Sequence, residues 1–166
     1  MTERTACFSG HRPEKLPYGG DENHPFTAEL KSMLHLAVRE TAEAGYTRFI
    51  SGMARGVDLW ACESVLALSR EFPSLKLICA LPYAGCEQSL RGLDRIRFNS
   101  AVEKAFETVT LAEAYNPGCL RARNAWMVEH SSRLIAVCTD MRSGTGQTIR
   151  LARKGGLSVR LISVER

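Results

Sequence analysis

The sequence lacks the features that mark several large classes of protein. None of its apolar runs reaches the roughly 18 residues that a membrane-spanning helix needs, and residues 1–4 do not begin a signal peptide. We therefore expect a cytoplasmic protein that does not bind membranes. Aromatic residues make up only 7% of the 166 residues, so few side chains are available for a base-stacking surface on single-stranded nucleic acid.

Complete catalytic and metal-binding motifs are also missing. The chain has no zinc spacing, no HExxH helix, no Ser-His-Asp order and no convincing pair of catalytic carboxylates. We therefore assign no catalytic residue, metal or cofactor, and we lean toward a protein that is not an enzyme. The six cysteines form no CxxC pair and fall mostly within apolar segments, which favours reduced, structural thiols. They are Cys7, Cys62, Cys79, Cys86, Cys119 and Cys138.

The composition is that of an ordinary globular protein, with 45% hydrophobic and 24% charged residues, and the length predicts a single domain over residues 1–166. The net charge of +4 is unevenly distributed. Residues 1–115 carry 13 Lys and Arg against 15 Asp and Glu, whereas residues 116–166 carry 9 against 3. A basic C-terminal third indicates either an anionic partner or simply an Arg-rich surface helix.

Apolar strands alternate with amphipathic helices along the whole chain. Strands that are apolar along their length and separated by helices indicate a parallel sheet covered on both faces. The sequence therefore predicts a three-layer, doubly wound α/β fold with a mostly parallel sheet. The strands are expected at 5–9, 46–50, 75–81, 107–111, 133–138 and 158–164, and the helices at 27–44, from just beyond 56 to about 71, and at 90–104, 122–131 and 143–155.

The stretch 49–58 organises the rest of the chain. It leaves an apolar strand, passes through Gly52 and Gly56, and opens a helix. Glycine permits close backbone approach and a helix start presents unpaired N–H groups, so the pattern favours an anion, usually phosphate. Ser51 lies in the turn, Arg55 would add a charge-assisted contact, and Asp58 would either cap the helix or accept from a sugar hydroxyl. The alternative is a tight turn without a ligand.

Polar residues, glycine or proline follow three other predicted strands. In such sheets ligands bind beyond the carboxyl ends of the strands, so these stretches are expected to converge on one site. The stretch 143–148 offers N–H groups and hydroxyls at a helix start, but no Lys follows its glycines, so it is not a Walker loop. The residues concerned are Gly10, His11, Arg12, Pro82, Ser143, Gly144, Thr145 and Thr148. Arg123 and Asn124, beside an apolar helix, could face either this site or solvent.

Several of these motifs resemble a known family. Residues 51–58, SGMARGVD, resemble the SGxARGxD signature of the DprA/Smf DNA-processing proteins. Together with GHRP at 10–13, RNAWMV at 123–128 and Gly144-Thr145, they make the chain similar to the YpsA-like branch of the SLOG superfamily over nearly its full length. The resemblance implies a Rossmann-like sheet and a nucleotide or nucleotide-derived ligand, and it allows a homodimer through helix faces.

The chain departs from the hydrolytic members of that superfamily. The LOG enzymes, which split nucleoside 5′-monophosphates, carry a PGGxGTxxE motif with a catalytic Glu. Here residues 143–146 read SGTG, and Arg150 stands where an acid is required. This departure from the LOG motif therefore argues against the hydrolysis of nucleoside 5′-monophosphates.

Three hypotheses follow, from different classes of function. The first is a cytoplasmic, sensor-like protein that binds a nucleotide or another phosphate-bearing small molecule. The second is an N-glycosidic hydrolase of nucleoside 5′-monophosphates that uses an unidentified acid. The third is a DprA-like single-stranded DNA-binding protein, which the basic C-terminal third supports and the scarcity of aromatic residues opposes.

Overall fold

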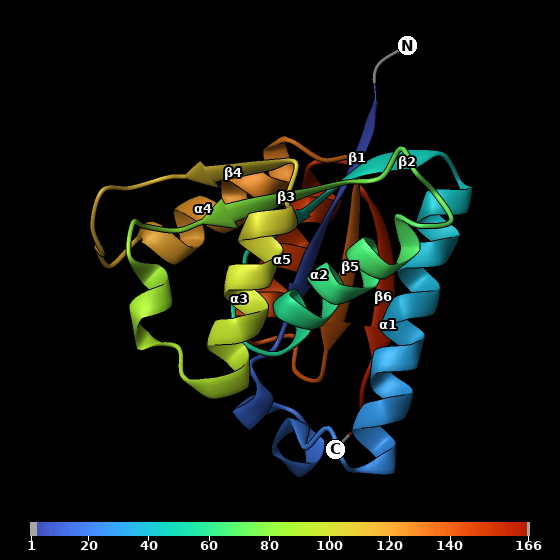
Figure 1. Cartoon of the computed structure of the whole chain (residues 1–166), viewed down its shortest axis with the longest axis horizontal. Helices are drawn as coiled ribbons and strands as arrows, with labels where there is room; N and C mark the ends of the chain where they lie inside the picture. The colour runs from blue at the N-terminus through green and yellow to red at the C-terminus, as the bar shows by residue number, and fades with distance from the viewer. Residues whose placement is uncertain (1–2, 166) are drawn as a thin grey trace.

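The computed structural model describes residues 3–165, and its core is a six-stranded sheet with helices on both faces (Figure 1). The strands are β1 (Arg4–Gly10), β2 (Tyr46–Ser51), β3 (Lys76–Leu81), β4 (Glu107–Thr110), β5 (Arg133–Cys138) and β6 (Ser158–Ser163). The α-helices are α1 (Pro25–Glu43), α2 (Val57–Leu68), α3 (Gly92–Lys104), α4 (Cys119–Glu129) and α5 (Gly144–Lys154). Short 3-10 turns occur at Pro13–Lys15 (η1), Pro17–Gly20 (η2) and Cys86–Ser89 (η3).

All five strand pairings are parallel, in the order β4-β3-β2-β1-β5-β6. Cys7 of β1 lies beside Ile50 on one side and Leu134 on the other, so β1 is central. From β1 the chain builds outward through β2, β3 and β4, and it then returns to place β5 on the opposite side of β1. The prediction of a doubly wound sheet is confirmed, and its switch point lies between the carboxyl ends of β1 and β5.

Two apolar layers hold the helices against the sheet. Helices α1, α2 and α3 cover one face, where Phe8, Phe49 and Leu77 are buried, and α4 and α5 cover the other, where Ile50, Ile78 and Met127 are buried (Figure 1). Alternate residues of a strand point to opposite faces, and both faces are covered here. This arrangement explains why the strands are apolar along their length rather than alternating.

An ion-pair cluster fixes α3 beside the start of α1. Arg97 donates two hydrogen bonds of 2.7 Å to the Glu22 carboxylate, and Lys31 donates one of 2.8 Å. These donors lower the pKa of Glu22 to about 2. The cluster ties the segment that precedes α1 to the helix that borders the candidate site.

The ends of four helices differ from the sequence predictions, including α3, which begins at Gly92 rather than near residue 90. Helix α1 begins two residues early because Pro25 fits the first turn and His24 Nδ1 accepts from Phe26 N at 3.0 Å. Helix α2 ends at Leu68, not near residue 71, since Leu68 O accepts the N–H groups of both Glu71 and Phe72. Helix α4 begins three residues early, immediately after the turn at Gly118.

The described residues include no helix that is long and apolar enough to cross a bilayer. Among these residues the six thiols are free, and only Cys86 is not fully buried, in keeping with the structural role predicted for them.

Candidate functional site

Two adjoining cavities open at the carboxyl ends of the strands. The larger, of about 620 Å³, lies at the ends of β1 and β5 and is called the switch-point cavity. The smaller, of about 450 Å³, lies at the ends of β2 and β3 and is called the β3 cavity. They share four wall residues, so they form two lobes of one cleft; these residues are Arg12, Ala54, Leu120 and Arg123.

Most of the residues predicted from sequence line this cleft. Those in the wall of the switch-point cavity are Gly10, His11, Arg12, Asp58, Arg123, Asn124, Ser143, Gly144 and Thr145. Those in the wall of the β3 cavity are Gly52, Arg55 and Pro82, with Arg12 and Arg123 again. Ser51, Gly56 and Thr148 line neither lobe, and each has a role in the architecture beneath it.

The turn after β2 is held in an unusual backbone conformation. Gly56 has a φ of 85°, and a Cβ there would lie 2.9 Å from His11 O, so only glycine fits. Met53 also has a positive φ, of 65°, which is uncommon for a residue with a side chain. Ser51 stabilises the turn from below, because its Oγ accepts from Met53 N at 3.2 Å and donates to Asp58 O at 3.0 Å.

Asp58 is a buried carboxylate in the wall of the switch-point cavity. Only 5% of the residue is exposed. Its Oδ2 accepts from Ala54 N at 3.2 Å, so it stabilises the turn rather than capping α2, and among the described residues Oδ1 has no hydrogen-bond partner. Burial raises the pKa of Asp58, whereas Arg123 chiefly, then the Ala54 N–H group and Arg12, act in the opposite direction. An unpaired buried oxygen beside a cavity is suited to a ligand donor.

Arg123 reaches from α4 to the turn after β2. It is only 8% exposed, and its Nη1 donates to Gly52 O at 2.8 Å while Asn124 Oδ1 accepts from Nε and Nη2. A Cβ on Gly52 would lie 2.9 Å from Arg123 Nε, so this glycine leaves room for the guanidinium. Arg123 therefore sets the wall between the two lobes and places a positive charge near Asp58.

The start of α5 forms the opposite wall of the switch-point cavity. Ser143 is the N-cap, and its Oγ accepts from Gly146 N at 3.2 Å. Helix geometry gives the N–H groups of Gly144 and Thr145 no acceptor within the helix, and these two residues border the cavity. A Cβ on Gly144 would meet nothing within 4 Å, whereas one on Gly146 would overlap Met141 O. Gly144 thus keeps the helix start open, and Gly146 permits close packing beneath it.

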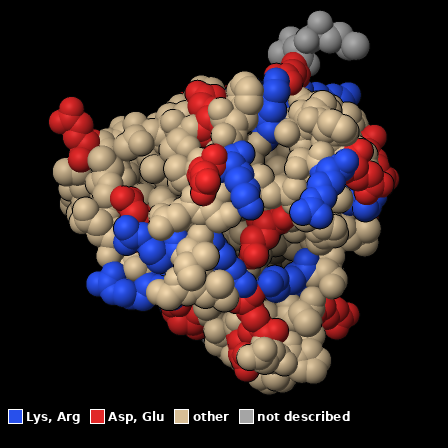
Figure 2. Space-filling model, viewed as in Figure 1, with Lys and Arg blue, Asp and Glu red and all other residues tan. Residues whose placement is uncertain are grey.

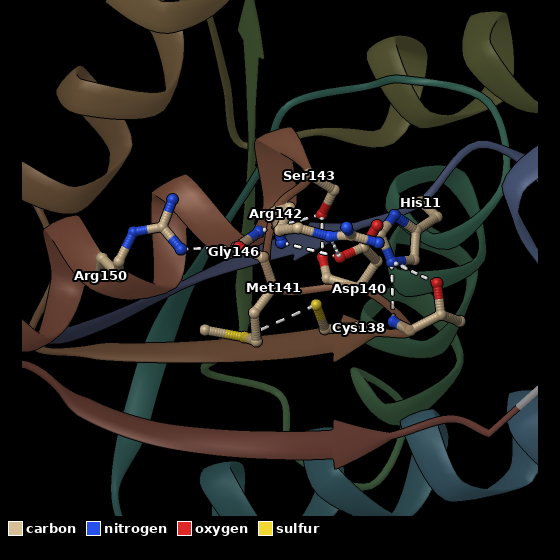
Figure 3. Close-up of polar contacts among 9 residues, drawn as sticks. His11, Cys138, Asp140, Met141, Arg142, Ser143, Gly146 and Arg150 are labelled. Carbon is tan, nitrogen blue, oxygen red and sulfur yellow. Dashed lines mark hydrogen bonds and ion pairs between the residues drawn. The ribbon is translucent and has the colours of Figure 1, made fainter.

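His11 joins the two strand ends at the switch point. Its Nε2 accepts from Thr139 N at 2.8 Å and lies 3.1 Å from Thr139 Oγ1. Figure 3 shows His11 meeting the loop that follows β5, where Asp140 accepts from both N and Nε of Arg142. On the other side of this loop Arg150 donates to Met141 O at 2.6 Å, so its guanidinium faces the loop.

Arg55 does not extend freely into the cleft. Its Nη2 donates to Glu14 Oε1 at 2.8 Å, and its side chain is 37% exposed at the edge of the β3 cavity. A phosphate contact from Arg55 remains a prediction, and it would have to compete with this ion pair.

Sequence patterns did not identify several wall residues. In the switch-point cavity these include Lys15, Thr139, Asp140 and Arg142, and in the β3 cavity Leu90 and Arg91. Their positions just after β1, β3 and β5 were the available signal. Nothing in the sequence, however, indicated which loop residues turn inward.

Positive charge predominates around the cleft. Its wall includes Lys15, Arg12, Arg121 and Arg142 beside the carboxylates of Asp58 and Asp140. Figure 2 shows Lys and Arg side chains gathered at the lower left, beside α3 and the segment that precedes it. Among residues 3–165, no group of three or more His, Cys, Asp or Glu side chains could hold a metal ion. The cleft is therefore suited to an anionic ligand rather than to a bare cation.

A family model for the YspA SLOG family matches residues 6–153, which include every wall residue of both lobes of the cleft. The chain belongs to the YspA SLOG family. The resemblance stated from the sequence motifs is thereby confirmed.

Relatives in this family are moderately similar in sequence. A UPF0398 protein of Bacillus cereus (strain G9842) is 26% identical over 156 residues, which are 92% of this chain and 84% of the relative. The SPbeta prophage-derived protein YoqJ of Bacillus subtilis (strain 168), itself named as uncharacterized, is 28% identical over 79% of this chain and 84% of its own.

The solved structure of DNA processing protein A from Helicobacter pylori, described for its single-stranded DNA binding mode, has the same fold. It superposes with a TM-score of 0.63 at 21% sequence identity over 95% of this chain. This chain spans 64% of that longer one, and the likeness supports the Rossmann-like SLOG fold alone.

Proposed function

We propose that the switch-point cavity binds a nucleotide or a nucleotide-derived small molecule. The observation that carries the proposal is the pairing, in one cavity, of an open helix start at Gly144 with the buried carboxylate of Asp58. The helix start suits a phosphate. The unpaired Oδ1 of Asp58 suits the hydroxyl donors of a sugar, and a nucleotide carries both a phosphate and a sugar.

Other features of the site support this assignment. Arg142 and Lys15 add positive charge to the wall of the cavity, and the cavity volume of about 620 Å³ falls within the range of small-molecule sites. The ligand would also neutralise part of the positive charge at the rim. We further propose that the protein acts in the cytoplasm as one domain and responds to its ligand as a sensor.

AMP is expected to stabilise the protein more than adenosine does. At a hundred times its dissociation constant a ligand adds about 2.7 kcal/mol, which for a chain of this size is a rise in Tm of about 5–10 °C. Adenosine lacks the phosphate and should give less than a third of that rise. Thermal unfolding with AMP, CMP, GMP and the matching nucleosides measures both effects.

The sugar contact is tested with 2′,3′-dideoxy-AMP on wild type and Asp58→Asn. The wild type should bind AMP about tenfold more tightly than the dideoxy compound, because the dideoxy sugar has no hydroxyl to donate a hydrogen bond to Asp58. The variant should lose most of that preference. Equal shifts with AMP and adenosine, or no shift with any nucleotide, would overturn the proposed function.

We also predict that the protein does not release free base from AMP, CMP or GMP at an enzymatic rate. The position at which the LOG enzymes carry their acid is Arg150, which donates to Met141 O and lies outside the cavity wall. Chromatography after long incubation checks this. Turnover near 1 per second, an ordinary enzymatic value, would favour the hydrolase hypothesis and direct attention to Asp58 and Asp140.

Single-stranded DNA remains the alternative ligand, favoured by the shared fold of DNA processing protein A and by the basic C-terminal third. We propose only a weak, salt-sensitive affinity for single-stranded DNA. The attraction between the basic residues and the DNA phosphates is electrostatic, so it weakens as the salt concentration is raised.

A further inference from the structure

The β3 cavity is not needed to hold a single nucleotide, yet it opens into the same cleft. The two lobes meet at Arg12 and Arg123, and each has a volume that suits a nucleoside-sized group. The four shared wall residues make the cleft continuous from the start of α5 to the end of β3.

The wall of the β3 cavity differs in chemistry from that of the switch-point cavity. It contains the apolar or aromatic side chains of Met53, Pro82, Tyr83 and Leu90, whereas the start of α5 offers hydroxyls and N–H groups. Tyr83 packs edge-on against Tyr115, with ring centroids 5.5 Å apart and planes at 82°. This contact holds the Tyr83 ring from one side at the lobe's wall, and a planar group could stack on a ring held in this way.

The wall between the lobes carries the charge that a bridging phosphate needs. Arg12 is exposed there, and Arg123 is buried and fixed through its hydrogen bond to Gly52 O. The positive φ of Met53 is part of the turn that brings the Gly52 carbonyl to Arg123. Backbone strain of this kind is common at ligand sites.

We infer that the natural ligand has two ring-bearing halves joined through a pyrophosphate, with one half in each lobe. This inference rests on the proposed function: the first half is the nucleotide at the switch-point cavity. The second half places a planar ring, such as a nucleobase, against Tyr83, and the bridging phosphates lie along the wall formed by Arg12 and Arg123. A mononucleotide would fill only one lobe and would leave the aromatic wall unused.

Titration calorimetry with AMP, ADP and P1,P2-di(adenosine-5′) diphosphate tests the inference. The dinucleotide should bind at least tenfold more tightly than ADP, since stacking of one base on an aromatic side chain contributes roughly five- to a hundredfold. Tyr83→Ala should remove most of this gain while AMP affinity changes less than twofold. Ser89→Trp, which fills the same lobe from an exposed wall position, should have the same effect without removing a packed ring.

Tyr18→Ala is the matched control, because Tyr18 is 62% exposed and lines neither lobe. It should leave the affinity for all three compounds unchanged. If AMP binds but the dinucleotide gains nothing over ADP, or if Tyr83→Ala weakens AMP and dinucleotide equally, the two-lobed ligand is wrong and the proposed function stands. If no nucleotide binds, the proposed function itself fails. A dT oligonucleotide that binds more tightly than the dinucleotide, and does so at raised salt, would overturn the pyrophosphate class in favour of single-stranded DNA.

Discussion

Replacing Gly144 with Met is expected to lower the affinity for AMP about a hundredfold while leaving the protein folded. A Cβ on Gly144 meets nothing within 4 Å, and the residue lines the switch-point cavity, so the new side chain would enter the space proposed for the phosphate. It would block the N–H groups of Gly144 and Thr145, and each charge-assisted contact is worth roughly 1.5–3 kcal/mol. Titration calorimetry measures the loss, and urea unfolding checks the fold.

Gly118→Met is the matched control for this variant. Gly118 also lies at a helix start, as the N-cap of α4; a Cβ there meets only Asn116 Oδ1 at 3.7 Å, and it borders neither lobe of the cleft. It should bind AMP as tightly as the wild type does. If Gly144→Met also retained full affinity, the start of α5 would not be the phosphate site.

Replacing Arg123 with Met is expected to reduce the free energy of unfolding by about 2–4 kcal/mol at pH 7. The change removes the donor to Gly52 O and leaves Asp58 buried without its strongest nearby positive charge. Removing one partner of a buried pair costs more than the pair contributes, because the remaining group has already lost its water. Urea unfolding at constant pH measures the difference. Arg121→Met, an exposed arginine two residues earlier on α4, should stay within about 0.5 kcal/mol of wild type.

The deficit of the Arg123→Met variant should shrink at lower pH. Burial already raises the pKa of Asp58 in the folded protein, and removal of Arg123 raises it further. Between the unfolded and the folded pKa the native state binds the extra proton, so stability increases as pH falls through that range. Unfolding curves at pH 7 and pH 5 should show the variant closer to wild type at pH 5. A deficit that is identical at both pH values would mean that lost packing alone explains it.

Local patterns in the sequence were sufficient to predict most secondary structure. Each strand is a short apolar run because both faces of the sheet are covered. The helices repeat their apolar residues at helical spacing. Both patterns involve residues that are close together in the sequence. Glycine turns and helix starts are equally local. For this reason the stretches after β1, β2 and β5 were recognised as candidate binding elements before any tertiary information.

Some predicted roles changed because burial and side-chain direction depend on neighbours. Ser51 and Thr148 were expected at the ligand, but Ser51 bonds within the turn and Thr148 Oγ1 donates to Gly144 O at 3.1 Å. Arg55 pairs with Glu14, a residue 41 positions earlier in the chain. A sequence pattern indicates that a polar residue lies near a turn, but it does not indicate which group that residue will contact.

The sequence by itself determined the alternation of strands and helices, the class of fold and the four strand ends that border the cleft. Only the tertiary structure decided that β5 lies beside β1, which brings Gly144 opposite Asp58, and that Arg123 reaches Gly52 across 71 residues of chain. It also decided that Tyr83 and Tyr115 meet at the edge of a second lobe. The physical reason is that strand order and side-chain contacts depend on how the two helical layers pack on the sheet, and that packing joins residues whose separation in sequence carries no periodic signal.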